Sequence, residues 1–148
     1  MIDLVCEQLQ TWLQSAVGVS PVSFAPPGAT TGARGVSCYL LELAEDPPLR
    51  GARNAPLQLA CHFLVTCWAP TPLEANRLLG EVIFAAMQHA DYRVLLQPAP
   101  AELWLAFATL PRPSFVLRVP VHVTRPQTLA PRVRKPIDGK YSKVTEPG

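Results

Sequence analysis

Every second residue from Leu57 to Cys67 is hydrophobic, and the pattern changes to helical spacing just beyond this segment. On a strand, residues two positions apart share a face. One face of the segment is therefore apolar, with Leu57, Leu59, Cys61, Phe63, Val65 and Cys67, and the other carries Gln58, His62 and Thr66. The pattern predicts a strand, which we place at the centre of a sheet.

A helix is predicted directly after this strand, over residues 72–89. Thr71 stands three residues before Glu74, with Pro72 between them, which is typical of a capping box with proline at the first helical position. Apolar residues then recur at helical spacing, so one face of the helix can pack back against the strand. These residues are Leu73, Leu78, Leu79, Val82, Ile83, Ala86 and Met87.

Proline clusters divide the remaining sequence into short elements. Helical periodicity predicts a helix over residues 2–17, ended by Gly18. Strands are predicted over 19–24, 36–45, 93–96 and 115–123, and a loop over 26–35, whereas residues 102–108 fit a helical turn or a strand. Pro120 cannot donate a ladder hydrogen bond, so the last strand is expected to be at an edge or bulged there.

These elements predict an α+β fold, with a mainly antiparallel sheet of four or five strands and two helices packed on one face. The other face is expected to carry no helix. On it, apolar side chains would be exposed as a surface for a neighbouring molecule. The candidates are Tyr39, Leu64, Trp68 and Val116.

Charge divides the chain near residue 124. Residues 1–124 hold seven Lys and Arg against nine Asp and Glu, a net charge of −2, whereas residues 125–148 hold six against two, a net charge of +4. All three lysines lie in the second part, together with prolines at positions 126, 131, 136 and 147. Such asymmetry indicates an interaction tail. We therefore predict an α+β domain over 1–124 and an extended, basic, proline-rich C-terminal arm over 125–148.

No arrangement of residues predicts catalysis. The sequence lacks a G-x-S-x-G elbow, a P-loop and a G-x-G-x-x-G turn. Its four cysteines lack the C-x-x-C spacing of a zinc site, and we expect them to be reduced and buried. His62 and His122 are expected to be neighbours on the helix-free face, but no carboxylate of known proximity completes a metal site. We predict neither enzymatic activity nor a cofactor.

No apolar run reaches the roughly 18 residues of a membrane span, and the N-terminus lacks the features of a signal peptide. We therefore expect no membrane association and predict that the chain folds in the cytoplasm.

Five stretches also carry a family resemblance: Met1–Val5, Phe63–Ala69, Glu74–Gly80, Glu102–Trp104 and Arg112–Ser114. Together they resemble the N-terminal domain of cap or tail-terminator proteins of phage-tail-like contractile injection systems, of the Photorhabdus virulence cassette and antifeeding prophage type. The likeness covers residues 1–125 and implies a tail-terminator-like fold.

The resemblance also implies a structural function. Copies of the chain would form a ring, hexameric like the tube it ends, that stops polymerisation of tube and sheath and anchors the last sheath layer in a phage-tail-like particle. Tyr39, Leu64, Trp68 and Val116 would face the ring or tube interface. Residues 140–145 favour β-structure and would add as a strand to a sheath subunit. The sheath-binding residues of the arm would be Arg132, Arg134, Lys135, Lys140, Tyr141, Lys143 and Val144.

Two other functions stay open at this point. A tail-completion protein of a contractile phage would share the same features. Because the chain ends sooner than longer family members, the resemblance does not decide between capping of the tube, the sheath or both. A nucleic-acid-binding module would use the basic arm to neutralise phosphates, but the acidic charge of residues 1–124 makes binding of nucleic acid an unfavoured alternative.

Overall fold

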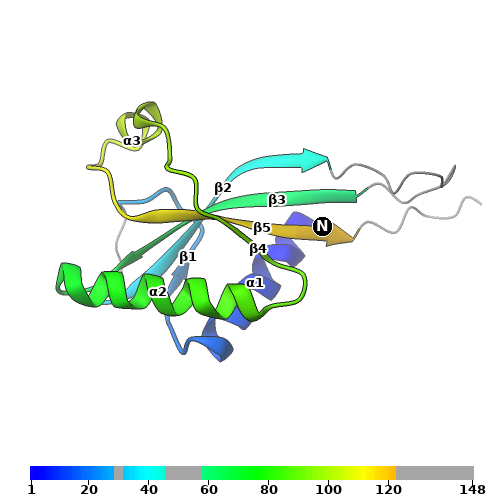
Figure 1. Ribbon diagram of the computed structural model, residues 1–148, viewed down its shortest axis with the longest axis horizontal. Coiled ribbons are helices and arrows are strands. Elements are labelled where there is room, and N and C mark those ends of the chain that lie inside the picture. Colours follow the sequence, from blue (N-terminus) through cyan, green and yellow to red (C-terminus); the bar gives the residue numbers. More distant parts are fainter. Residues whose placement is uncertain (29–31, 46–57, 123–148) are drawn as a thin grey trace, which may run out of the picture.

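The structure is a computed structural model that describes residues 1–28, 32–45 and 58–122 (Figure 1). In this part of the chain, five strands form one sheet in the order β1-β2-β3-β5-β4. The strands are β1 Val22–Ser23, β2 Gly35–Glu45, β3 Gln58–Trp68, β4 Arg93–Leu95 and β5 Ser114–His122. The helices are α1 Ile2–Ala16, α2 Pro72–Gln88 and α3 Ala101–Ala106.

The sheet is mixed. β3 lies at its centre, as predicted, and pairs antiparallel with both β2 and β5, while β4 pairs antiparallel with β5. β1 pairs parallel to β2 through two residues only. The predicted antiparallel arrangement is therefore right for four strands, and the parallel edge strand is a correction to it.

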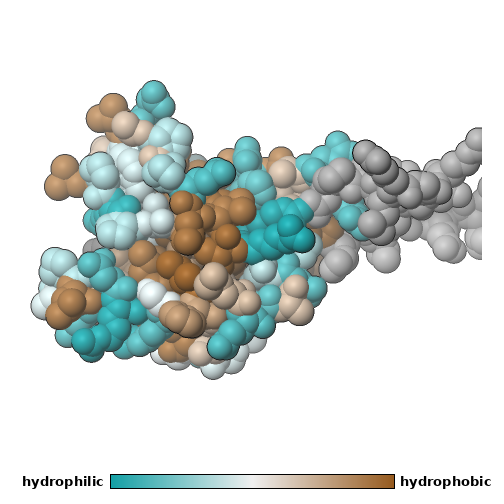
Figure 2. All heavy atoms as spheres, viewed as in Figure 1, coloured by the Kyte–Doolittle hydropathy of each residue, from teal (hydrophilic) through white to brown (hydrophobic). Residues whose placement is uncertain are grey.

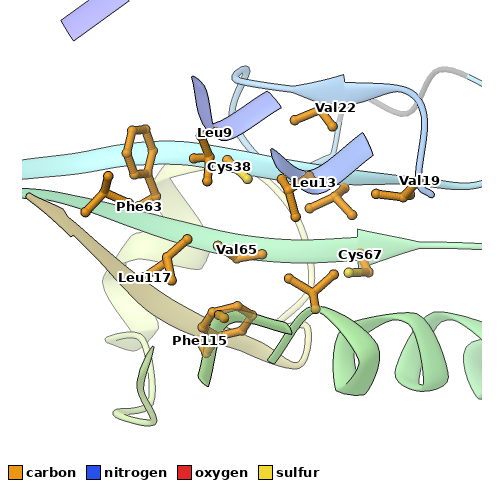
Figure 3. Packing of buried hydrophobic residues seen from close by; sticks show 14 of the residues in the cluster. Leu9, Leu13, Val19, Val22, Cys38, Phe63, Val65, Cys67, Phe115 and Leu117 are labelled. Carbon is orange, nitrogen blue, oxygen red and sulfur yellow. The ribbon is translucent and has the colours of Figure 1, made fainter. Parts of the chain in front are cut away.

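The main core lies between the sheet and the helices α1 and α2, which cover the same face (Figure 1). Figure 3 shows Leu9 and Leu13 of α1 beside Cys38 and Val22, with Phe63, Val65, Phe115 and Leu117 of the central strands in the same layer. The apolar face predicted for β3 is confirmed, since Cys61, Phe63, Val65 and Cys67 all belong to this core.

α2 begins as predicted. Thr71 is its N-cap and accepts a hydrogen bond at Oγ1 from the backbone N–H of Glu74, at 3.3 Å, and Pro72 occupies the first turn. Leu78, Leu79, Val82 and Ala86 are buried, with Ile83 packed at the margin of the core. Two positions were wrong, because Leu73 and Met87 are exposed. They lie on the side of the helix turned away from the sheet.

The second face of the sheet differs from the prediction. Residues 102–108 fitted either a helix or a strand, and the structure forms α3 there, on the face opposite α1 and α2 (Figure 1). Leu64, Trp68 and Trp104 are buried outside the main core. This face is therefore covered by a third helix over part of its area, and the expectation of a helix-free face is wrong.

Leu57 and Val123, predicted at strand ends, and the predicted arm over 125–148 lie outside the described residues. Pro120 is opposite Ala60 of β3, two residues beyond Arg118, the last β5 residue that pairs with β4. Among the described residues, β5 is thus an edge strand at Pro120, which is one of the two arrangements that the missing N–H of proline predicted.

Candidate functional site

A row of side chains crosses the α3-covered face of the sheet. Tyr39 of β2 is opposite Leu64 of β3, which is opposite Val116 of β5. The Tyr39 ring packs edge-on against Phe107 with centroids 5.1 Å apart, and Phe107 packs in turn against Trp104. Three aromatic side chains therefore fasten α3 to the sheet.

Because of this packing, the predicted interface residues are less exposed than expected. Leu64 is 1% exposed and Trp68 is 7% exposed, so the exposure expected for these two residues is wrong. Tyr39 and Val116 are half-buried. Over the area that α3 covers, a partner would contact α3 before it contacts the sheet.

Further along the same face lies a polar group on three strands. His62 of β3 is opposite Glu42 of β2 and Arg118 of β5, and its Nδ1 is 2.8 Å from Glu42 Oε1. A β-bulge makes this pairing possible, because the register shifts between Leu40 and Glu42 and leaves Leu41 as an extra residue. Without the shift, Glu42 would lie on the core face with Leu40.

The two histidines expected to be neighbours are not brought together. His122 is opposite Gln58, four residues along β3 from His62, which corresponds to about 13 Å on an extended strand. In the described ranges, no group of three His, Cys, Asp or Glu side chains is arranged to hold a metal ion.

The cysteines act as core residues. All four are free thiols, and Cys38, Cys61 and Cys67 are buried while Cys6 is partly buried. Burial raises the pKa of Cys67 to about 12 and also raises the pKa of Cys38. A thiol with a raised pKa holds little thiolate near neutral pH, so these side chains pack as small hydrophobic groups.

A hollow lies where β3 ends and α2 begins. It has a volume of about 640 Å³ and is lined by apolar residues, including Leu79, Leu110, Pro111 and Pro113, with Arg112 at its wall. Figure 2 shows a hydrophobic surface between α3 and α2 and hydrophobic side chains that project around α3. Among the exposed side chains, Leu105 and Leu110 are 80% and 82% exposed.

A second set of apolar side chains is exposed on α2. Leu73, Phe84 and Met87 each expose more than half of their surface on this helix. Exposed apolar groups of this kind, gathered on one helix and around α3, are typical of a protein that binds other proteins. These exposed residues were not predicted from the sequence, because Leu73 and Met87 follow the helical spacing of the buried residues.

Among the described residues, β2 and β5 are also unpaired on their outer sides over part of their length. β1 covers only Val36 and Ser37 of β2, and β4 covers only residues 116–118 of β5. The sequence already indicated this feature, because the flanking strands were predicted to be short. In the structure, the three residues of β4 cannot pair with all nine residues of β5. The residues of the arm that were predicted to bind the sheath are outside the described part of the chain.

None of the helices in the described segments is long and apolar enough to cross a membrane. Residues 3–91 match the family described as the Pvc16 N-terminal domain. A comparison with curated proteins finds no match.

Two solved structures are similar in fold. One is the sheath/tube terminator, in the extended state, of the extracellular contractile injection system PVC, with 19% identity and a TM-score of 0.64 over 86% of this chain and 58% of that chain. The other is the tube-terminating cap of the anti-feeding prophage, with 18% identity and a TM-score of 0.59 over 85% of this chain and 56% of that chain. This chain thus spans less than two thirds of the length of either protein.

Proposed function

The chain belongs to the Pvc16 N-terminal domain family, and from this premise we propose that it is a structural terminator of a contractile injection system. The observation that carries the proposal is the family match over residues 3–91. It is supported by a fold like that of two proteins that end the tube, or the sheath and tube, of such particles.

The surfaces of the described domain fit an assembly role. A ring forms when one surface of each copy binds a different surface of the next copy and the rotation closes. The exposed apolar residues of α2 and those around α3 lie on different elements, so the domain has distinct surfaces for such contacts. In the proposal, copies of the chain form a hexameric ring at the end of the tube, and the ring stops polymerisation and holds the last sheath layer.

The nucleic-acid alternative gains no support from the described surface. The described residues hold five arginines and no lysine against eight carboxylates, which gives a net charge of −3. Nucleic-acid-binding domains instead gather positive charge on one face. A tail-completion protein of a contractile phage stays compatible with the same fold.

The test is electron microscopy of the purified full-length chain, alone and with the tube protein of the same particle. We expect rings, and tubes that carry a ring at one end and stop growing once it is bound. A chain that stays monomeric at tens of micromolar and leaves tube length unchanged would contradict the proposal. A variant with Leu105→Ser and Leu110→Ser serves as a probe of the α3 surface, because both side chains are exposed and their replacement leaves the core intact.

A further inference from the structure

β2 has an open edge over most of its length. β3 pairs with it from Gly35 to Glu45, but on the other side β1 pairs only with Val36 and Ser37. From Cys38 to Glu45, the backbone groups that point away from β3 therefore have no strand partner among the described residues. Such an edge is a template for one more strand.

The unpaired parts of β5 and β2 differ in how well they resist the addition of a further strand. The open part of β5 contains Pro120, which has no N–H to offer to a further strand. The open part of β2 contains neither proline nor lysine, the residues that commonly block edges. Its only interruption is the bulge at Leu41, so Glu42–Glu45 form a regular stretch beyond it, where Leu43 is 49% exposed.

The side chains of this stretch select a basic partner. Glu42 and Glu45 are both exposed and, being three residues apart on a strand, lie on opposite faces. A strand with two basic residues at the same spacing would place one cation beside each carboxylate, and opposite charges on neighbouring strands attract. Glu42 Oε1 is also 2.8 Å from Nδ1 of His62 on β3, so a cation on an added strand would share this carboxylate with His62.

The chain itself contains such a segment. Lys140 and Lys143 are three residues apart and flank Tyr141, in a stretch without proline that favours β-structure. We propose that residues 140–145 of a second copy add as a strand, parallel to β2, along Glu42–Glu45. In this register Lys140 is beside Glu42, Tyr141 beside Leu43 and Lys143 beside Glu45. The antiparallel alternative pairs the same charges but places Ser142 beside Leu43, so it loses the apolar contact.

The connecting sequence is long enough to reach a neighbouring copy. β5 ends at His122 and β2 at Glu45, with β3 between them, so the two ends are about 10 Å apart, two strand spacings. Residues 125–139 would span about 45 Å at ~3.1 Å per residue in the extended form that their prolines favour. That reach suits an adjacent copy in a ring.

This inference rests on the proposed ring and changes the target that the resemblance implied for the arm, from a sheath subunit to another copy of the chain. It assigns a role to Glu42, Leu43 and Glu45, and links the acidic domain to the basic arm. Main-chain pairing supplies the directional bonds, while the charges set the register.

The experiment is disulfide cross-linking between two full-length chains, both carrying Cys6→Ser to remove the partly exposed native thiol. One chain carries Leu43→Cys, and the other carries Tyr141→Cys and an affinity tag that separates the two on a gel. We expect a disulfide-linked mixed dimer as the main product of mild oxidation, because neighbouring strands lie about 4.8 Å apart, within the Cα separation that a disulfide spans. Two controls replace Tyr141→Cys with Ser142→Cys, or Leu43→Cys with the highly exposed Leu105→Cys.

Each result of this experiment supports or contradicts a specific part of the proposal. Equal cross-linking of Leu105→Cys would overturn the proposal. A third variant carries both Leu43→Cys and Tyr141→Cys on one chain, and a disulfide that forms only within this chain would overturn it as well. If Ser142→Cys cross-links to Leu43→Cys more than Tyr141→Cys does, the parallel register is wrong. If Tyr141→Cys cross-links to added sheath protein instead of to Leu43→Cys, the sheath is the target of the arm. If rings form without the mixed disulfide, strand addition is contradicted and the terminator role is kept. If the disulfide forms without rings or tube capping, only the terminator role is contradicted.

Discussion

The two faces of the sheet are buried by different means. On one face, α1 and α2, of 15 and 17 residues, cover a continuous layer of aliphatic side chains with Phe63 and Phe115 at its centre. On the other face, α3 has only six residues and is attached by Trp104, Phe107 and Tyr39. A helix that short is not stable alone in water. Its contacts with the sheet therefore hold α3 in place, and the second face is both a small core and the support of a projecting interaction surface.

The largest effect is expected from Phe63, which is fully buried in the main core. Phe63→Ala removes a large aromatic group from between α1, β2 and β5, and we expect the free energy of unfolding to fall by about 3 to 5 kcal/mol. Chemical denaturation followed by circular dichroism measures this change. An unchanged midpoint would mean that the assignment of the two faces is inverted.

The matched variant on the other face is Leu64→Ala, one position along the same strand. Because Leu64 is 1% exposed, we expect a loss of about 2 to 5 kcal/mol. A loss within about 0.5 kcal/mol, the usual range for a surface substitution, would instead show that α3 does not cover this face in solution. The pair therefore tests the second core independently of the first.

The sequence predicted the first face well and the second poorly, for physical reasons that particular residues illustrate. Apolar residues at every second position from Cys61 to Cys67, and helical spacing after Thr71, each mark a surface that is buried along one regular element. Leu64 and Trp68 lack such a signal, because β3 is buried on both faces in this region and alternation disappears there.

Two further features depend on tertiary contacts that periodicity does not carry. The bulge at Leu41 places Glu42 on the face of His62, whereas an uninterrupted strand would place it on the core face. α3 forms because Trp104 and Phe107 find partners on the sheet, although local sequence fits either state. Leu73 and Met87 followed the helical pattern closely enough to be assigned to the core, and only the position of α2 on the sheet shows that they are exposed.

A smaller effect is expected where the second face meets the end of the sheet. Gly35 is opposite Trp68, and a Cβ atom added at Gly35 would overlap the indole ring. Gly35→Ala should therefore cost about 1 to 3 kcal/mol, as overpacking of a core does. The matched control is Gly80→Ala in α2, where a Cβ atom meets nothing within 4 Å and where alanine should stabilise the helix by about 0.5 to 1 kcal/mol. Thermal melts of the two variants should shift in opposite directions, and a shared direction would contradict the packing of Trp68 over Gly35.

The smallest effect separates the two kinds of helix. α2 has a side-chain cap at Thr71, whereas α3 begins after Pro100 with no side-chain cap. Thr71→Ala removes the acceptor for the Glu74 N–H, and we expect a loss of about 1 kcal/mol. Thr71→Ser keeps the hydroxyl and should retain most of the stability, which distinguishes loss of the hydrogen bond from loss of packing. Because the lost hydrogen bond lies in the first turn of α2, amide hydrogen exchange should accelerate there in Thr71→Ala. Exchange in α3, on the other face of the sheet, should stay unchanged. Equal acceleration in α3 would show that the two faces do not unfold independently and that the small core depends on α2.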